Sequence, residues 1–306
     1  MTLNSKQTHL LLDTDIGTDV DDAMTLIQLI GEDLAPKMSI TTAYGDCDLR
    51  AKITRRYCNL SNVEIPIYSG EQATLSGKEV WVSGLEGSLH EGLDVETSFE
   101  DGAVDHILEV SHDETKELSI LAIAPLTNIA KAVLRDPTFT SRVKHLYLMG
   151  GRFDDGKLEH NIVSDVTAAE VVFSAGFSIT VVGIEATLRV RMLEPMIKRI
   201  KMAGPVGNVL SKEIYQWWDY WSESWSVPHD PIAALTFLKP ELFVFSEPGE
   251  IQVVTSGLET GKTIFKHSNS GTHRMVTDFD PQMIAEEIVK SIEQLELRRM
   301  IKNAIA

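Results

Sequence analysis

Strand-like apolar runs alternate with amphipathic segments along most of the chain. The strand-like runs lie at 9–12, 38–44, 118–124, 143–149 and 178–183. Apolar residues recur with helical spacing at 20–30, 49–60, 127–134 and 282–300. Residues 251–256 and 263–266 flank Gly257 and Gly261 and are predicted to form a hairpin.

This alternation predicts the α/β class, with a mostly parallel, open, Rossmann-like sheet that carries helices on both faces. We find no internal repeat and no linker, so residues 1–306 are predicted to form a single domain. Residues 196–228 are the least regular stretch and are a candidate helical lid. Four tryptophans in this stretch are typical of a core or an interface, with stacking on a substrate as the alternative: Trp217, Trp218, Trp221 and Trp225.

The amino-acid composition and net charge of the chain limit the kinds of molecule that it is expected to bind. The chain is 43% hydrophobic and has a net charge of -17, which disfavours binding to nucleic acid or to an anionic membrane surface. Residues 1–9 are polar and contain no secretion signal, and no apolar run approaches the ~20 residues of a membrane helix. Cys47 and Cys58 are too few for a disulfide framework and are expected to be reduced. These features predict a cytoplasmic protein.

The strongest chemical signal is a run of aspartates between the first predicted strand and the first predicted helix. Five fall within ten residues: Asp13, Asp15, Asp19, Asp21 and Asp22. Ligands of open α/β sheets bind at the carboxyl ends of strands, and so many carboxylates repel one another unless a cation is bound. Oxygen ligands of this kind suit Ca²⁺ or Mg²⁺. Helix capping explains one or two of them, such as Asp19, but not all five.

Two other carboxylate motifs match the aspartate run less well. An EF-hand loop needs a third Asp or Asn before its glycine, and here Ile16 precedes Gly17. A haloacid-dehalogenase phosphatase begins with a strand followed by Asp-x-Asp-x-Thr. Asp13 and Asp15 fit that pattern, but Gly17 takes the place of the threonine, so this class is the alternative enzyme.

The chain resembles the inosine-uridine nucleoside hydrolase family, whose first motif reads Asp-x-Asp-Pro-Gly-x-Asp-Asp-Ala. Six residues match it, with two extra residues before the aspartate pair: Asp13, Asp15, Gly17, Asp21, Asp22 and Ala23. Later segments resemble further family motifs in the same order: 40–45 (ITTAYG), 124–128 (APLTN), 149–151 (MGG), 159–165 (EHNIVSD) and 229–231 (HDP). Several ordered motifs are more specific than any one of them.

The resemblance implies calcium-dependent hydrolysis of the N-glycosidic bond of a ribonucleoside or a ribose-like glycoside. The implied Ca²⁺ ligands are Asp15, Asp22, the carbonyl of Thr127 and Asp230. The implied partners of the ribose hydroxyls are Asp21, Glu159 and Asn161. Asp15 would also take a proton from a water on the metal. His229 is the candidate acid for the leaving group, with a structural histidine that orients Asp230 as the alternative.

The chain departs from the family pattern where substrate contacts are expected. Asp46 replaces an asparagine, and Val82-Ser83-Gly84 stands where a His-Gly pair is usual, with His90 further on. We therefore expect Asp46 at the substrate, and the leaving group stays open. A non-catalytic calcium and sugar binding protein on the same fold is the alternative from another class. We also expect a homodimer or homotetramer.

Overall fold

A computed structural model describes residues 6–305; residues 1–5, part of the polar N-terminal segment, and residue 306 lie outside it. Its main sheet is mixed and mostly parallel, in the order β12-β11-β13-β7-β6-β5-β1-β2-β3-β4, with β10 paired to β13. The parallel strands are β1 Gln7–Thr14, β2 Met38–Thr42, β3 Ile67–Ser69, β4 Glu100–Asp101, β5 Lys116–Ala122, β6 Val143–Met149 and β7 Ile179–Val182. The remaining strands are β10 Phe243–Phe245, β11 Gly249–Val253, β12 Thr263–His267 and β13 His273–Phe279. Strand β13 is parallel to β7 and antiparallel to β10 and β11.

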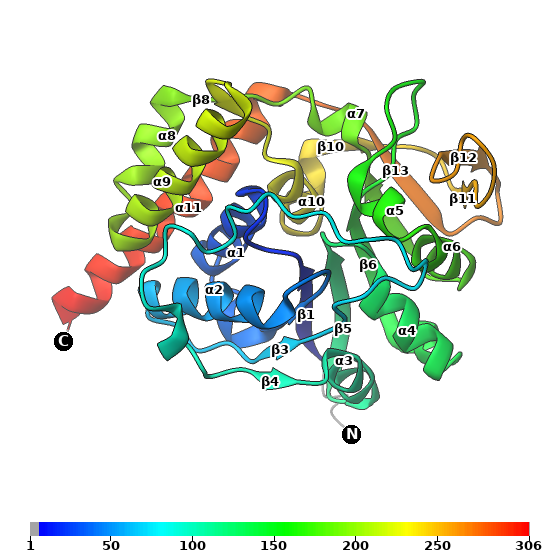
Figure 1. Ribbon diagram of the computed structural model, residues 1–306, viewed down its shortest axis with the longest axis horizontal. Coiled ribbons are helices and arrows are strands. Elements are labelled where there is room, and N and C mark those ends of the chain that lie inside the picture. Colours follow the sequence, from blue (N-terminus) through cyan, green and yellow to red (C-terminus); the bar gives the residue numbers. More distant parts are fainter. Residues whose placement is uncertain (1–5, 306) are drawn as a thin grey trace.

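Helices cover both faces of this sheet (Figure 1). One hydrophobic core lies beneath α1 Asp21–Gly31, α2 Cys47–Leu60, α8 Glu194–Lys201, α9 Gly204–Trp221, α10 His229–Leu238 and α11 Pro281–Ile305. The other lies beneath α3 Ala103–His112, α4 Thr127–Arg135 and α6 Val166–Ser174, with the short α5 His160–Ser164 beside them. The short helix α7 Ile184–Thr187 follows β7, and β8 Met192–Leu193 pairs with β9 Trp225–Ser226.

The predicted class, the single parallel-rich sheet and the layers of helices are confirmed. Segment 118–124 forms most of β5, although the strand begins and ends two residues earlier. Its pairing with β6 ends at Ala122, and the Ile123 N–H still donates to the Asp13 carbonyl of β1 at 2.9 Å. The predicted hairpin is the antiparallel pair β11–β12. Most of 196–228 is helical, within α8 and α9. Whether it acts as a lid stays a prediction.

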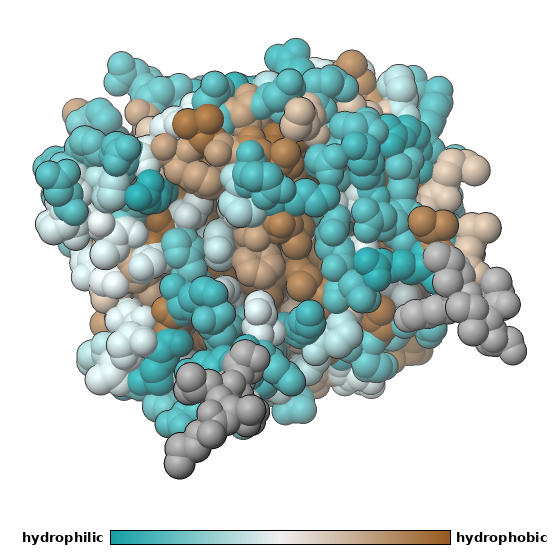
Figure 2. Space-filling view, turned by 180° about the vertical axis from the view of Figure 1, so that it is seen from behind, coloured by the Kyte–Doolittle hydropathy of each residue, from teal (hydrophilic) through white to brown (hydrophobic). Residues whose placement is uncertain are grey.

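One face of the molecule is mostly hydrophilic (Figure 2), and the two cysteines of the chain are free. Figure 2 shows hydrophilic residues over most of the face opposite that of Figure 1, with hydrophobic residues gathered near its centre. Cys47 and Cys58 are buried and form no disulfide. Among the described residues, no helix is both long and apolar enough to cross a bilayer.

The order of the strands fixes where a site can form. β1 lies at the centre of the parallel part, hydrogen-bonded to β2 on one side and to β5 on the other. Asp13, near its carboxyl end, is in register with Thr41 of β2 and Ala122 of β5. The acidic segment that follows β1 therefore leaves the sheet between two neighbouring strand ends, where open α/β sheets bind ligands.

Candidate active site

A cavity of about 590 Å³ opens at these strand ends. Its walls come from the loop after β1, the starts of α1, α5 and α10, the loop at 78–81 and the end of α9. Polar lining residues on one side are Asp15, Asp19, Asp21, Asp22, Glu159, Asn161, His229 and Asp230. Aromatic lining residues are Tyr44, Trp81, His160, Trp217 and Trp221.

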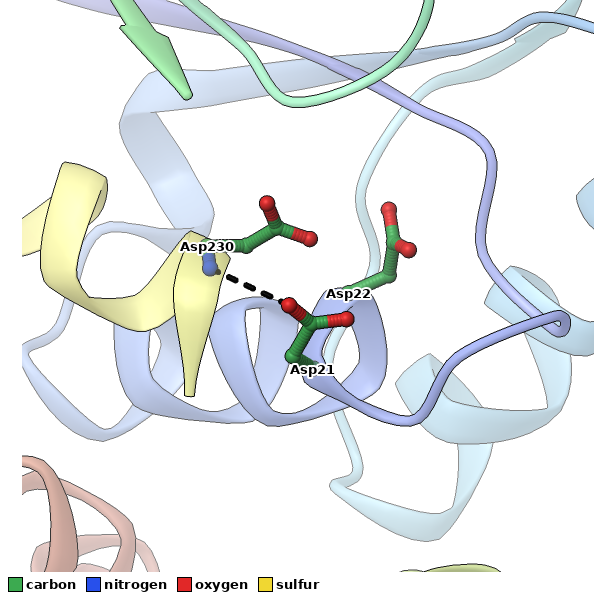
Figure 3. Close-up of side chains that lie close together, drawn as sticks. All are labelled: Asp21, Asp22 and Asp230. Atoms are coloured by element: carbon green, nitrogen blue, oxygen red, sulfur yellow. Dashed lines mark hydrogen bonds between the residues drawn. The ribbon is translucent and has the colours of Figure 1, made fainter. Parts of the chain in front are cut away.

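Three buried carboxylates form the centre of the polar side. One oxygen of each of Asp21, Asp22 and Asp230 lies within 4.8 Å of the others. Asp21 and Asp22 stand in the first turn of α1 and Asp230 in the first turn of α10, and Figure 3 shows the three groups turned toward a common space. The main-chain N–H of Asp230 donates to Oδ2 of Asp21 at 3.2 Å. Burial and mutual repulsion raise the pKa of all three well above the usual range.

The remaining aspartates of the run separate into two groups. Asp15 and Asp19 line the cavity, and burial raises the pKa of each, to about 7 for Asp19. Asp13 does not line it. Its Oδ1 accepts from Thr41 Oγ1 at 2.6 Å and from Asn128 Nδ2 at 2.7 Å, inside the sheet. The five aspartates therefore form no single ligand group, because Asp13 lies within β1 and is held by Thr41 and Asn128, whereas the other four follow the end of that strand at Thr14.

Glu159 and Asn161 line the same polar side of the cavity as the aspartates. Glu159 precedes α5, and its carboxylate accepts from the N–H groups of Gly151 at 2.9 Å, Asn161 at 2.6 Å and Ile162 at 3.0 Å. Burial raises its pKa against the effect of these bonds. The Asn161 amide donates to the Ile123 carbonyl at 3.0 Å. Its orientation is thus fixed by the main chain, with the amide oxygen left for a ligand hydroxyl.

His229 opens α10 beside the acidic group. Its Nδ1 lies 2.6 Å from Thr187 Oγ1, and that hydroxyl donates to the Ile184 carbonyl at 3.0 Å. Because a hydroxyl has one proton to donate, Nδ1–H is the donor to Thr187 and Nε2 is the unprotonated nitrogen. Burial lowers the pKa of His229 to about 4, so the neutral ring is the form at neutral pH.

Two of the residues expected at the site are not among those that line the cavity, and for Thr127, whose carbonyl is the implied ligand, its place as a ligand stays a prediction. Asp46 is exposed and outside the cavity, contrary to its expected place at the substrate. Its carboxylate accepts from the Leu49 N–H at 2.9 Å and caps α2, because the first turn of a helix leaves such donors unpaired. Thr127 is buried at the start of α4 and does not line the cavity, and its hydroxyl donates to Asp165 Oδ2 at 2.7 Å.

The aromatic wall was not predicted as a unit. Tyr44 and Trp81 meet His160 edge-on, with ring centroids 5.9 Å and 5.7 Å away. Trp217 and Trp221, one turn apart on α9, meet edge-on at 5.8 Å. The tryptophan-rich segment carried a signal for the second pair, although a core or interface was the favoured interpretation. Nothing in the sequence alone pairs Trp81 with His160.

The relation to known proteins agrees with this geometry. Residues 10–286 match the profile described as inosine-uridine preferring nucleoside hydrolase. The chain belongs to that family. The predicted family is confirmed, and a haloacid-dehalogenase phosphatase is excluded. Nucleoside hydrolysis, the cleavage of an N-glycosidic bond, is therefore its activity.

Individual members of the nucleoside hydrolase family show the range of relatives. Uridine nucleosidase 1 of Arabidopsis thaliana is 29% identical, over 85% of this chain and 82% of its own. Pyrimidine-specific ribonucleoside hydrolase RihA of Enterobacter sp. (strain 638) is 25% identical, over 94% and 99%. The structure of the purine-preferring ribonucleoside hydrolase of Gardnerella vaginalis superposes with a TM-score of 0.82 at 22% identity, over 95% and 99%. That likeness concerns the fold alone.

Proposed function

We propose that this nucleoside hydrolase cleaves ribonucleosides in a calcium-dependent reaction, with uridine and other pyrimidine ribonucleosides as substrates. The observation that carries the proposal is the convergence of the buried aspartates with Glu159 and Asn161 on one cavity. The names of the uridine nucleosidases and of the pyrimidine-specific hydrolase among its relatives support the choice of base.

The donor set fits a hard divalent cation. Three buried carboxylates within 4.8 Å of one another need a positive charge between them, and oxygen ligands favour Ca²⁺ over softer metals. We propose Asp15, Asp22, Asp230 and the carbonyl of Thr127 as ligands. Asp21, which accepts from the Asp230 main chain, is then left for a ribose hydroxyl. A bound Ca²⁺ would hold sugar hydroxyls and make a water easier to deprotonate.

The protein's own groups supply the remaining chemistry. Asp15 is proposed to take the proton from the attacking water as the bond to the sugar forms. Asp21 and Glu159 accept from the ribose hydroxyls, and the Asn161 amide oxygen accepts from another. Cleavage passes through an oxocarbenium-like transition state, and the carboxylates around the sugar stabilise its positive charge.

The aromatic side of the cavity suits a flat leaving group. Trp81, Trp217 and Trp221 offer ring faces and edges to a base. To protonate that base, His229 would have to be the imidazolium, with a proton on Nε2 as well as on Nδ1, and would return to the neutral ring after giving the Nε2 proton to the base. The second candidate role is a neutral histidine that only orients Asp230, and the hydrogen bond from Nδ1 to Thr187 favours it.

His229→Ala separates these two roles. Uridine needs a proton on its leaving base, whereas the leaving group of 4-nitrophenyl riboside departs without one. An acid role predicts that His229→Ala loses roughly 10²–10⁴-fold in kcat on uridine and little on 4-nitrophenyl riboside. Equal losses on both substrates would assign His229 to the orientation of Asp230.

Ribose release from uridine, cytidine and inosine, with added calcium or with a chelator, tests the function as a whole. We expect calcium-dependent release that is fastest from the pyrimidine ribosides. Asp15→Asn is expected to lower kcat by about 10²–10⁴-fold. Asp46→Asn, outside the cavity, is the matched carboxylate-to-amide control and is expected to be nearly unchanged. No release from any ribonucleoside in calcium buffer would overturn the proposal.

A further inference from the structure

A buried arginine lies against the loop that carries Asp15, the proposed base. We name residues 15–20, between β1 and α1, the acidic loop. Arg50 of α2 is 2% exposed. Its Nη1 donates to the carbonyls of Asp15 and Ile16, the latter at 2.9 Å, and its Nη2 donates to Thr18 Oγ1 at 3.1 Å. A single guanidinium thus binds the acidic loop at three points.

The same guanidinium binds the aromatic wall. Arg50 Nε donates to the Tyr44 carbonyl at 2.7 Å. Tyr44 has a φ of 69°, a left-handed conformation that is unfavourable for a residue with a side chain and persists only where its surroundings hold it. The Tyr44 hydroxyl accepts a hydrogen bond from the main-chain N–H of Trp81 at 2.9 Å. Arg50 therefore connects the acidic loop to the wall proposed to contact the base.

The acidic loop packs closely against α2 and is held from its other side as well. Gly17 has a φ of 113°, and a Cβ there would lie 2.7 Å from Ile53 Cδ1 of α2. The Thr18 hydroxyl, which accepts from Arg50, donates to Glu86 Oε1 at 3.0 Å. Relative to the family motif, this loop carries two extra residues before Asp21. The longer loop thus has contacts that compensate for its added freedom.

We propose that Arg50 is a positioning residue that holds the acidic loop, and with it the Asp15 carboxylate, in the geometry that binds the metal. This inference rests on the proposed function, in which Asp15 is a ligand of the metal. The partners of Arg50 are three main-chain carbonyls and one hydroxyl, so its hydrogen bonds fix backbone and not a particular carboxylate. Groups of this kind around a metal site typically contribute 10–100-fold to affinity.

A positioning role and a purely electrostatic role of Arg50 predict opposite changes in calcium affinity when Arg50 is replaced. A positive charge beside the site repels Ca²⁺, so loss of charge alone would tighten binding in Arg50→Met and leave Arg50→Lys unchanged. Loss of position weakens binding in both, because neither side chain reproduces the planar fork of an arginine. We expect both variants to bind Ca²⁺ about 10–100-fold more weakly by isothermal titration calorimetry of the full chain.

Arg55 provides the matched control. It is 5% exposed on the same helix, and its fork donates to the Ser98 carbonyl at 2.8 Å and the Ile65 carbonyl at 2.9 Å, away from the acidic loop. Arg55→Lys is expected to lower stability without changing calcium affinity. Thr18→Val, at a half-buried position, is the milder variant. It removes one contact of the guanidinium and is expected to weaken calcium binding less than either Arg50 variant.

Hydrogen exchange gives a readout that needs no metal. In Arg50→Lys and Arg50→Met, the amides of residues 15–20 are expected to exchange faster than in the parent chain, while Arg55→Lys leaves them unchanged. Unaltered exchange in this loop, or a calcium affinity that rises in Arg50→Met and stays constant in Arg50→Lys, would overturn the inference. A parent chain that binds no calcium would instead refute the proposed metal, and exchange alone would then decide on Arg50.

Discussion

Asp165 provides a sharp test of how the cavity is built. This residue is fully buried between α5 and α6 and does not line the cavity. Its Oδ2 accepts from the Leu75 N–H at 2.7 Å and the Thr127 hydroxyl at 2.7 Å. Its Oδ1 accepts from the Ser76 N–H at 2.9 Å and the Ala168 N–H at 3.2 Å. One carboxylate therefore joins the start of α4, the start of α6 and the loop that leads to Trp81.

The expected effect of Asp165→Ala follows from these four donors. Loss of the cap on α6 costs about 1 kcal/mol. Each hydrogen bond to a charged group contributes about 1.5–3 kcal/mol, and water replaces part of this at the exposed Ser76. With the cap and the bonds from Leu75 and Thr127 counted, we therefore expect the free energy of unfolding to fall by about 4–7 kcal/mol, a large part of the 5–15 kcal/mol typical of a domain.

Urea unfolding measures that loss, and trypsin tests where it acts. Lys78 follows the bonded loop residues, and Asp165→Ala is expected to speed cleavage after it by roughly a hundredfold, since about 3 kcal/mol of local stability is removed. Thr127→Val is the control, because it removes one donor and leaves both loop N–H groups bonded. It is expected to cost about 1–2 kcal/mol with no change at Lys78. A loss under 1 kcal/mol in Asp165→Ala, or equal cleavage in both variants, would refute this reasoning.

Other predictions concern the metal, the sugar and the fold. Asp22→Ala is expected to weaken calcium binding by roughly a hundredfold or more, and an ion seen at full occupancy in a crystal of this variant would contradict its place as a ligand. Removal of the 2′-hydroxyl from uridine is expected to lower kcat/KM by about 10⁴-fold, whereas equal rates would refute the proposed diol contacts. A Cβ at Gly31 would lie 1.9 Å from the Ser291 carbonyl, so Gly31→Ala is expected to destabilise the chain by about 1–3 kcal/mol in urea unfolding, and an unchanged midpoint would show that α11 shifts freely. Burial lowers the pKa of His9 and His106 to about 4, so the unfolded chain takes up protons first as the pH falls below about 6.5, and the urea midpoint is expected to drop between pH 6.5 and 4.

The pattern of apolar residues was sufficient to predict the central strands of the sheet but not the short strands at its edge. The run at 118–124 was readable because a parallel strand covered on both faces is almost wholly apolar, and Ser119 is the one polar residue of this run. β3 and β4 are three and two residues long, too short for any period to show. The helix α10 was not predicted because its residues are buried on every side of the helix. Its sequence therefore lacks the polar positions that would show a helical period.

Chemistry in the sequence located the site but not its internal arrangement. The density of aspartates after β1 gave the position of the acidic group, and the later His-Asp-Pro motif supplied Asp230. Which aspartates face the cavity depends on how the chain leaves the sheet, and Asp13 lies on the other side of that turn. Arg50 and Asp165 act through main-chain atoms of distant segments, and no residue pattern shows such contacts.

The origin of the central carboxylates explains how three acidic groups can share one site without a bound cation, and what the proposed cation would add. Asp21, Asp22 and Asp230 all stand in the first turns of α1 and α10, where the helix dipole stabilises a negative charge by up to about 2 kcal/mol. Two like charges about 4.8 Å apart repel by roughly 3 kcal/mol at an effective dielectric of 20, so three ionised groups repel by roughly 10 kcal/mol in total. Two helix ends offset less than half of this. The rest is removed either by protons, as the raised pKa values indicate, or by a divalent cation, and only the cation leaves the carboxylates charged for a developing oxocarbenium ion.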